Sequence, residues 1–270
     1  MLTRVISGIV GSAVLIGVLL GGVTVIEIAV VAVSVWCLME AFSAFSYHRY
    51  PICVILAILM CFFVPFFGCF SLPRLTGILF GLILFLTAVM VLQFGTIHFR
   101  DIAVMFLLLT VIPVSFATLI YLRKIPDFGV YYLWLPFIGA FMSDIFAFFV
   151  GGALKGPKLC KLLSPKKTVS GSIGGLVGSV IGFFVFSLVL WYGFHISVYP
   201  VPYYSLAVAT AVTGQLGDLF ASSIKRSVDL KDFGNVIPGH GGMLDRMDSV
   251  LFAGPTVYIF LVTFGLEIMR

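Results

Sequence analysis

A dense polar stretch, residues 222–248, interrupts an otherwise apolar chain of 270 residues. It holds eight of the 27 formal charges and one histidine, although the whole sequence is 61% hydrophobic and only 10% charged. Such a cluster between two long apolar segments is costly to place beside a bilayer. A solvated loop whose charges pair with one another is the alternative, and we favour a functional site.

The carboxylates of this stretch are spaced for metal binding. Asp245 and Asp248 lie three residues apart at the start of an apolar segment, so a helix would project both to one face. Asp218, inside the preceding apolar segment, completes an oxygen ligand set of the kind that Mg²⁺ prefers together with substrate phosphates. The cations that would clamp several phosphate groups are Lys225, Arg226, Lys231 and Arg246.

The sequence PGHGG, at residues 238–242, removes side-chain bulk around His240 and would let the backbone approach a ligand closely. Three roles for His240 stay open: a hydrogen-bond donor, a proton-transfer group or a residue that shapes the loop. Phosphoryl-type transfer depends more on positioning and charge neutralisation than on proton transfer.

A second basic segment, residues 151–175, combines five lysines with small and hydroxyl-bearing residues. Lysine side chains, the hydroxyl groups of Thr168 and Ser170, and backbone amides together predict phosphate binding. The glycine and lysine spacing of a P-loop is missing.

Two aspartates lie inside predicted membrane spans. Asp144 and Asp218 each precede the polar end of a span by several residues, which places both roughly 8–10 Å below the membrane surface. An intramembrane carboxylate usually faces a polar cavity or a cation, and pairing with a basic residue is the structural alternative. Glu40 is a weaker candidate, because it lies near the end of a span and could simply reach the interface.

The composition predicts an all-α, polytopic integral membrane protein with about nine transmembrane helices. Its mean hydropathy is +1.20, and a hydrocarbon core of about 30 Å requires roughly 20 apolar residues per helix. We divide the chain into residues 1–128, with five spans, and residues 129–270, a catalytic region with four spans and the two basic segments. The predicted spans are residues 5–22, 25–45, 52–72, 75–94, 102–122, 130–150, 173–195, 201–223 and 250–268.

Lysine and arginine residues divide unequally between the two ends of these spans, with 12 on the side of the N-terminus and 4 on the other. Positive charge favours the cytoplasmic side, so the N-terminus and both basic segments are expected there and the C-terminus outside. Nucleic-acid binding is not expected, because no separate basic domain remains.

Small residues indicate close packing between helices. Gly174, Gly178 and Gly182 recur every four residues, which favours helix contact over ligand contact. The five cysteines show no paired spacing and are interpreted as packing residues.

The polar stretch resembles the signature of the phosphatidate cytidylyltransferase (CDP-diacylglycerol synthase) family. Residues 164–168, SPKKT, are similar to a second element of that family together with Gly171, Gly174 and Gly175, and Asp144 holds the acidic position before it. Ser170 departs from the glutamate that many relatives carry there. The matching signature residues are Ser222, Ile224, Lys225, Arg226, Lys231, Asp232, Gly234, Ile237, Pro238, His240, Gly241, Gly242, Met243, Asp245, Arg246, Met247 and Asp248.

The resemblance implies an enzyme that transfers the cytidylyl group of CTP to phosphatidate, giving CDP-diacylglycerol and pyrophosphate, with Mg²⁺ as cofactor and K⁺ as a further candidate. It implies a site on the cytoplasmic face of a bacterial-type inner membrane, and glycine-lined helices suggest a homodimer. The implied site comprises catalytic Lys225, Arg226, Lys231, Asp232, His240 and Arg246, substrate-binding Asp144, Lys166, Lys167, Thr168, Ser222, Ser223, Gly241 and Gly242, and metal-binding Asp218, Asp245 and Asp248.

Other functions stay open on the residues alone. A CTP-dependent kinase acting on a polyprenol or diacylglycerol would handle metal and nucleotide similarly but release CDP. A CDP-alcohol phosphotransferase is disfavoured because its spaced aspartate pattern is missing. A transporter lined by Asp144 and Asp218 is disfavoured because the non-cytoplasmic side carries few charges.

Overall fold

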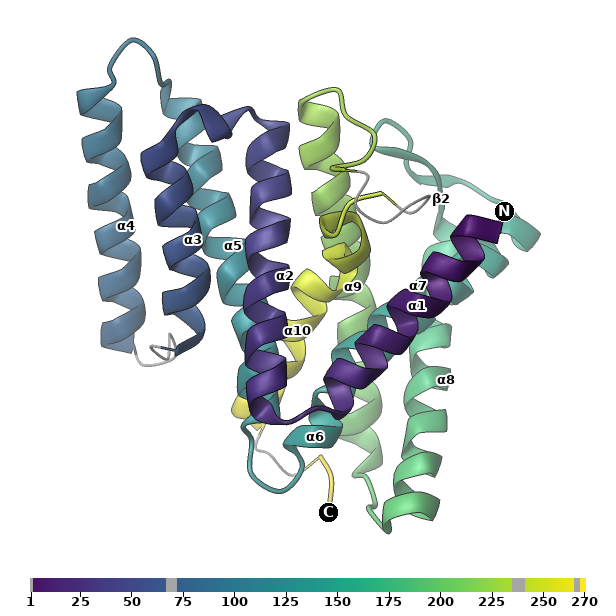
Figure 1. Ribbon diagram of the computed structural model, residues 1–270. Helices are drawn as coiled ribbons and strands as arrows, with labels where there is room; N and C mark the ends of the chain where they lie inside the picture. Colours follow the sequence, from purple (N-terminus) through teal and green to yellow (C-terminus); the bar gives the residue numbers. More distant parts are fainter. Residues whose placement is uncertain (1, 67–71, 235–240, 265–267) are drawn as a thin grey trace.

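The computed structural model describes residues 2–66, 72–234, 241–264 and 268–270, most of which are helical (Figure 1). The all-α membrane class is confirmed. The long helices are α1 (Leu2–Leu20), α2 (Val23–Ala44), α3 (Pro51–Phe66), α4 (Leu72–Leu92), α5 (Phe99–Arg123), α7 (Trp134–Leu154), α8 (Val169–Phe194), α9 (Pro200–Ser227) and α10 (Leu244–Phe264). The short elements are the 3-10 helix Tyr47–Arg49, the single-turn α6 (Gly129–Tyr132), β1 (Lys158–Cys160) and β2 (Ser164–Thr168).

Every predicted span overlaps a long helix, and the chain is an integral membrane protein. Helix α9 is not among the helices that are apolar enough to cross a membrane, because polar residues such as Gln215 and Asp218 interrupt its apolar sequence. A total of nine crossings therefore stays a prediction. Within the described ranges, six helices are long and apolar enough to cross a membrane, namely Val23–Ala44, Pro73–Leu92, Phe99–Arg123, Gly129–Leu154, Val169–Phe194 and Leu244–Phe264, and two apolar helices are shorter, Ile6–Leu20 and Pro51–Phe66.

Two helices extend beyond the predicted spans and carry polar residues of the site. Helix α9 continues to Ser227, so Lys225 and Arg226 are helical. Helix α10 begins six residues before the predicted span, which places Asp245 and Asp248 on its first two turns. Hydropathy ends a span where charges begin, whereas a helix needs only its backbone hydrogen bonds to continue.

The segment between α7 and α8 contains a β-hairpin that the sequence did not predict. Strands β1 and β2 pair antiparallel, with Lys158 opposite Thr168. Thr168 then caps α8, because its Oγ1 accepts a hydrogen bond from the backbone N–H of Gly171 at 3.1 Å. Strands of three and five residues are too short to show a clear alternating pattern.

Helix α10 joins the two predicted regions of the chain. It packs against α9 and α7 of the second region and against α5 and α2 of the first. Figure 1 shows the N-terminus, the β-hairpin and the described part of the α9–α10 connection at one end of the bundle, and α6 and the C-terminus at the other. This arrangement agrees with the sides assumed in counting basic residues, while the orientation in the membrane stays a prediction.

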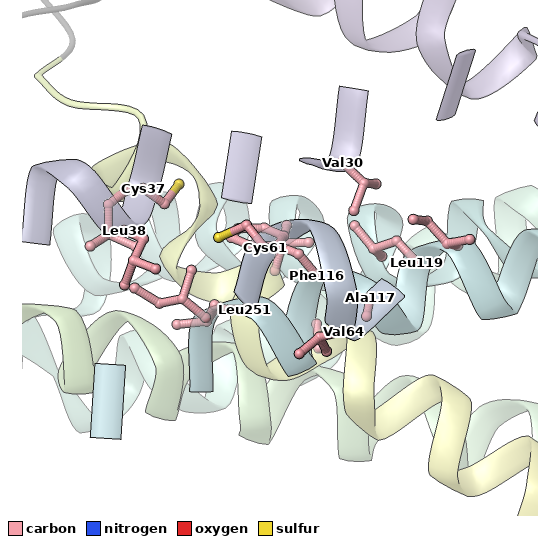
Figure 2. Close-up of a cluster of buried hydrophobic side chains, with 14 of the residues drawn as sticks. Val30, Cys37, Leu38, Cys61, Val64, Phe116, Ala117, Leu119 and Leu251 are labelled. Carbon is pink, nitrogen blue, oxygen red and sulfur yellow. The ribbon is translucent and has the colours of Figure 1, made fainter. Parts of the chain in front are cut away.

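An apolar core forms where α2, α3 and α5 pack together and α10 packs against α2 and α5 (Figure 2). Cys37 and Cys61 are fully buried free thiols in this cluster, and Cys61 accepts a hydrogen bond from Ser34 at 3.2 Å. These two cysteines are packing residues, as predicted.

Helices α7 and α8 pack closely along the glycines that recur every four residues. A Cβ atom at Gly174 would lie 2.5 Å from Val150, and one at Gly178 would clash with the side chain of Phe146. The predicted role of this glycine repeat in helix packing is confirmed. The close approach of these two helices also brings the start of α8 beside the second half of α7, because a Cβ atom at Gly171 would lie 2.8 Å from the carbonyl oxygen of Ala147.

Candidate active site

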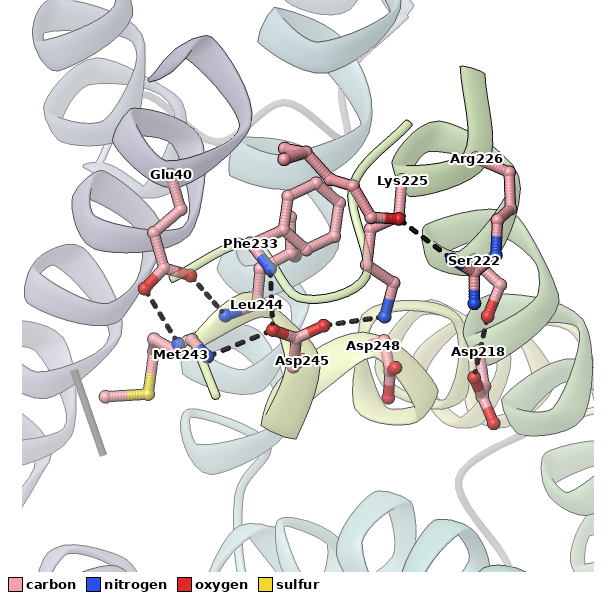
Figure 3. Close-up of polar contacts among 12 residues, drawn as sticks. Glu40, Asp218, Ser222, Lys225, Arg226, Phe233, Met243, Leu244, Asp245 and Asp248 are labelled. Atoms are coloured by element: carbon pink, nitrogen blue, oxygen red, sulfur yellow. Dashed lines mark hydrogen bonds and ion pairs between the residues drawn. The ribbon is translucent and has the colours of Figure 1, made fainter. Parts of the chain in front are cut away.

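A buried ion pair links the end of α9 to the start of α10 (Figure 3). Lys225 Nζ lies 2.6 Å from Asp245 Oδ1, and the two side chains are only 12% and 4% exposed. Asp245 Oδ2 accepts two further hydrogen bonds, from the backbone N–H of Phe233 at 2.9 Å and of Gly242 at 3.0 Å. A buried ion pair is tolerated when such bonds satisfy the remaining lone pairs. Asp245 therefore ties together α9, the residues that follow it and α10.

Three aspartates from three different helices converge beside this pair. Asp248 on α10 interacts electrostatically with Asp218 on α9, with Asp144 on α7 and with Lys225. Ser249 Oγ donates a hydrogen bond to Asp144 at 3.2 Å, which fixes α7 to α10 at this level. Like charges gathered within a membrane-embedded bundle call for a cation.

Lys167 supplies a positive charge to this cluster from the β-hairpin. Its Nζ lies 2.5 Å from Asp218 Oδ2, and both side chains are 27% exposed. Ser222, one turn after Asp218 on α9, donates to the other carboxylate oxygen at 3.4 Å. Two predicted motifs, more than 50 residues apart in sequence, thus meet at Asp218.

The close approach of α9 and α10 depends on Gly217. A Cβ atom there would clash with the carbonyl oxygen of Asp248 and would lie 2.9 Å from the Phe252 ring. The missing side chain therefore lets Asp218 and Asp248 face each other across the helix interface.

Gly217→Ala is expected to lower the free energy of unfolding by about 1–3 kcal/mol, because the added methyl group overpacks this contact, and to reduce turnover. Gly214→Ala on the same helix is the matched control, since a Cβ atom there would meet its nearest neighbour at 3.6 Å. That variant should stay within about 1 kcal/mol of the wild type. Unfolding in detergent, and the rate of the reaction that the motif resemblance implies, test the difference when both variants are measured. Equal behaviour of the two variants would contradict it.

A site of clustered carboxylates and lysines at the end of a membrane-embedded bundle suits polyanionic substrates, and the sequence comparisons agree. A model described as the cytidylyltransferase family matches residues 2–264. The chain belongs to the cytidylyltransferase family. Its relatives include a phosphatidate cytidylyltransferase of Bacillus subtilis, 32% identical over 97% of this chain and 98% of the relative.

Two further family members bear the same name and match a shorter region. The phosphatidate cytidylyltransferase of Aquifex aeolicus is 38% identical over 53% of this chain and 52% of its own length. That of Brucella abortus is 41% identical over the same shares. The protein is thus a nucleotidyltransferase, and the resemblance found in the motifs is confirmed.

Several residues implied by the family signature lie apart from the carboxylate cluster. Arg226, Lys231 and Asp232 are exposed, and Arg226 donates to the carbonyl oxygen of Leu230 at 3.0 Å. Arg246 is exposed as well, but it interacts electrostatically with Asp144 and so lies near the cluster. Lys166 is exposed on β2, Ser223 donates to its own helix at Phe220, and Thr168 caps α8. Gly241, with a φ of 84°, and Gly242 lie directly before α10. His240 lies outside the described residues.

A hydrogen-bond network beneath the cluster includes a residue that the sequence analysis missed. Gln215, one helical turn before Asp218, donates to Ser143 Oγ and to the backbone carbonyl of Ser172, each at 3.1 Å, and accepts a short hydrogen bond from Ser172 Oγ. This amide fastens α7, α8 and α9 together beside Asp144 and Asp218. The sequence did carry a signal for this residue, since Gln215 is an amide inside a predicted span and lies one turn from an acidic residue.

The carboxylates of the cluster suit Mg²⁺ in their chemistry. Among the described residues, no group of three histidine, cysteine or acidic side chains is close enough to form a metal cage. Both oxygens of Asp245 are engaged, whereas Asp248 accepts a hydrogen bond from Ser249 N at Oδ1 only, in the described part of the chain. Mg²⁺ is usually held by one or two carboxylates, waters and substrate phosphates, so Asp248 fits it directly. Asp218 would first exchange its contacts with Lys167 and Ser222 for the ion.

Proposed function

We propose that this protein transfers the cytidylyl group of CTP to phosphatidate, giving CDP-diacylglycerol and pyrophosphate for phospholipid biosynthesis. The observation that carries the proposal is the convergence of Asp144, Asp218 and Asp248 with Lys167 and Lys225. This cluster lies in a chain that aligns along nearly its full length with a phosphatidate cytidylyltransferase.

The residues of the cluster suit this chemistry. A phosphate oxygen of phosphatidate would attack the α-phosphorus of CTP, forming a new P–O bond while the bond to the bridging oxygen of the β-phosphate breaks and pyrophosphate leaves. Both reactants are polyanions that repel each other. Lys167 and Lys225 would offset this repulsion and hold the phosphate groups in line.

Of the predicted metal ligands, Asp248 would hold Mg²⁺ directly, Asp218 would join it once Lys167 turns to a substrate phosphate, and Asp245 would keep Lys225 in position. When bound, the ion would neutralise charge on the nucleotide phosphates. Replacing K⁺ by Na⁺ in the assay tests the further requirement for K⁺.

We place the site at the cytoplasmic face of a bacterial inner membrane. CTP arrives from the cytoplasm, and phosphatidate keeps its acyl chains in the lipid, so a reaction between them belongs at that interface. The end of the bundle with the β-hairpin carries most of the basic residues, which favours the same side. A homodimer stays part of the proposal and is tested by cross-linking in native membranes.

The decisive experiment follows both products with purified protein, labelled CTP, phosphatidate and Mg²⁺ in detergent micelles. Equal amounts of lipid-linked cytidine and pyrophosphate, both lost on chelation of Mg²⁺, are expected. Release of CDP with a phosphorylated lipid would instead identify a CTP-dependent lipid kinase. If neither pair of products formed in any of several lipid compositions, both activities would be refuted.

A further inference from the structure

Glu40 connects the first half of the chain to the start of α10. It lies near the end of α2, and its carboxylate accepts hydrogen bonds from the backbone N–H groups of Met243 at 2.9 Å and Leu244 at 2.8 Å (Figure 3). The residue is only 7% exposed. The first N–H groups of a helix have no partner within the helix, and a negative charge there is favourable. Glu40 thus supplies the cap of α10 from 203 residues away.

The same carboxylate contacts both flanks of the connection between α9 and α10. A Cβ atom at Gly234 would lie 3.2 Å from Glu40 Oε1, and one at Gly242 would lie 2.5 Å from Oε2. Glycine at both positions therefore leaves room for Glu40. On the other side of these flanks, Asp245 accepts the N–H groups of Phe233 and Gly242.

Glu40 and Asp245 together bind four backbone N–H groups around the start of α10. The position of this start decides where Asp245 and Asp248 point, because both side chains project from the first two turns of α10. Glu40 makes no contact with the carboxylate cluster that the described structure records, so any effect on catalysis must act through α10.

We propose that Glu40 is a positioning residue that fixes the start of α10 and thereby aligns Asp248 for Mg²⁺. The inference rests on the proposed function for its role in turnover. The capping of α10 and the alignment of the metal ligand can both be measured without substrate.

The test compares Glu40→Gln and Glu40→Asp with the wild type. Glutamine keeps the shape but replaces one acceptor by an N–H donor that faces a backbone N–H. Glu27→Gln is the matched control, because Glu27 lies on the same helix roughly 20 Å away and pairs with Lys124 at 2.6 Å.

Amide hydrogen exchange and thermal unfolding are recorded with Mg²⁺ alone in the same detergent. In Glu40→Gln the amides of Met243 and Leu244 should exchange at least tenfold faster. The Mg²⁺ concentration that gives half of the thermal stabilisation should rise by about tenfold, as for other residues that support metal ligands. In the activity assay kcat should fall about tenfold or more, while KM for phosphatidate changes little. Glu40→Asp should fall between wild type and Gln, and Glu27→Gln should match the wild type.

Unchanged exchange at Met243 and Leu244 would overturn the inference, as would faster exchange with a wild-type response to Mg²⁺. A wild-type protein that Mg²⁺ does not stabilise would overturn it as well, because α10 would then position no metal ligand. Failure of the proposed function is distinguishable, since it would appear as inactivity of the wild type with the exchange and Mg²⁺ responses intact.

Discussion

Asp248→Asn is expected to lower cytidylyl transfer by about 100-fold or more while the protein stays folded, and Asp218→Asn is expected to do the same. Loss of a residue that merely supports a metal ligand already costs about 10–100-fold, and these two aspartates are the proposed ligands themselves. Asparagine keeps the size and one oxygen but removes the charge. Relief of the repulsion between Asp248 and its acidic neighbours should keep the free energy of unfolding near or above the wild-type value.

The measurement is the initial rate of CDP-diacylglycerol formation at saturating CTP across a range of Mg²⁺ concentrations, together with thermal unfolding. Asp229→Asn is the matched control, since Asp229 is an exposed acidic residue of the same polar stretch and has no assigned role. A wild-type rate in Asp218→Asn or Asp248→Asn would remove that residue from the metal site. A large loss of rate in Asp229→Asn would show that the charge of the stretch, rather than the cluster, matters.

The sequence was most informative where local spacing determines geometry. The four-residue glycine repeat predicted the contact of α8 with α7, and the three-residue spacing of Asp245 and Asp248 predicted their place on one helix. The apolar segments located the long helices for the same reason. Hydropathy and helical periodicity are properties of neighbouring residues, so they can be read without the fold.

Long-range partners could not be predicted in this way. Glu40 was considered only as an acidic residue near the interface, because its partners are backbone N–H groups of Met243 and Leu244, which every sequence carries. Asp245 was grouped with the metal ligands by its type, although its engagement with Lys225 and two backbone N–H groups depends on how α9 and α10 meet.

The hairpin and the Gln215 network also depend on contacts between residues far apart in the sequence. Lys167 on β2 pairs with Asp218 on α9, and nothing in the SPKKT sequence specifies that contact. Gln215 satisfies groups on two other helices. The sequence therefore predicted which residue types gather at the site, and tertiary packing decides which of them face one another.

Breaking the buried pair should have the largest effect on stability: Asp245→Asn is expected to lower the free energy of unfolding by about 3–5 kcal/mol. It leaves the ammonium group of Lys225 buried without its partner, at a side-chain exposure of 12%. Lys225→Met leaves the Asp245 carboxylate with its two backbone hydrogen bonds and should cost less. The double variant should be more stable than the sum of the two losses predicts, because neither charge then stays buried alone.

The ion pair between Lys124 and Glu27 is a control for the effect of burial, because it has the same length as the Lys225–Asp245 pair but is more exposed. Its N–O separation is also 2.6 Å, but its side chains are 43% and 19% exposed, so Lys124→Met should cost no more than about 1 kcal/mol. Denaturant unfolding in mixed micelles gives all of these values. If Asp245→Asn and Lys124→Met cost the same, burial does not set the strength of the site pair. If the double variant shows simply additive losses, the backbone bonds of Asp245, rather than its pairing with Lys225, hold the start of α10 in place.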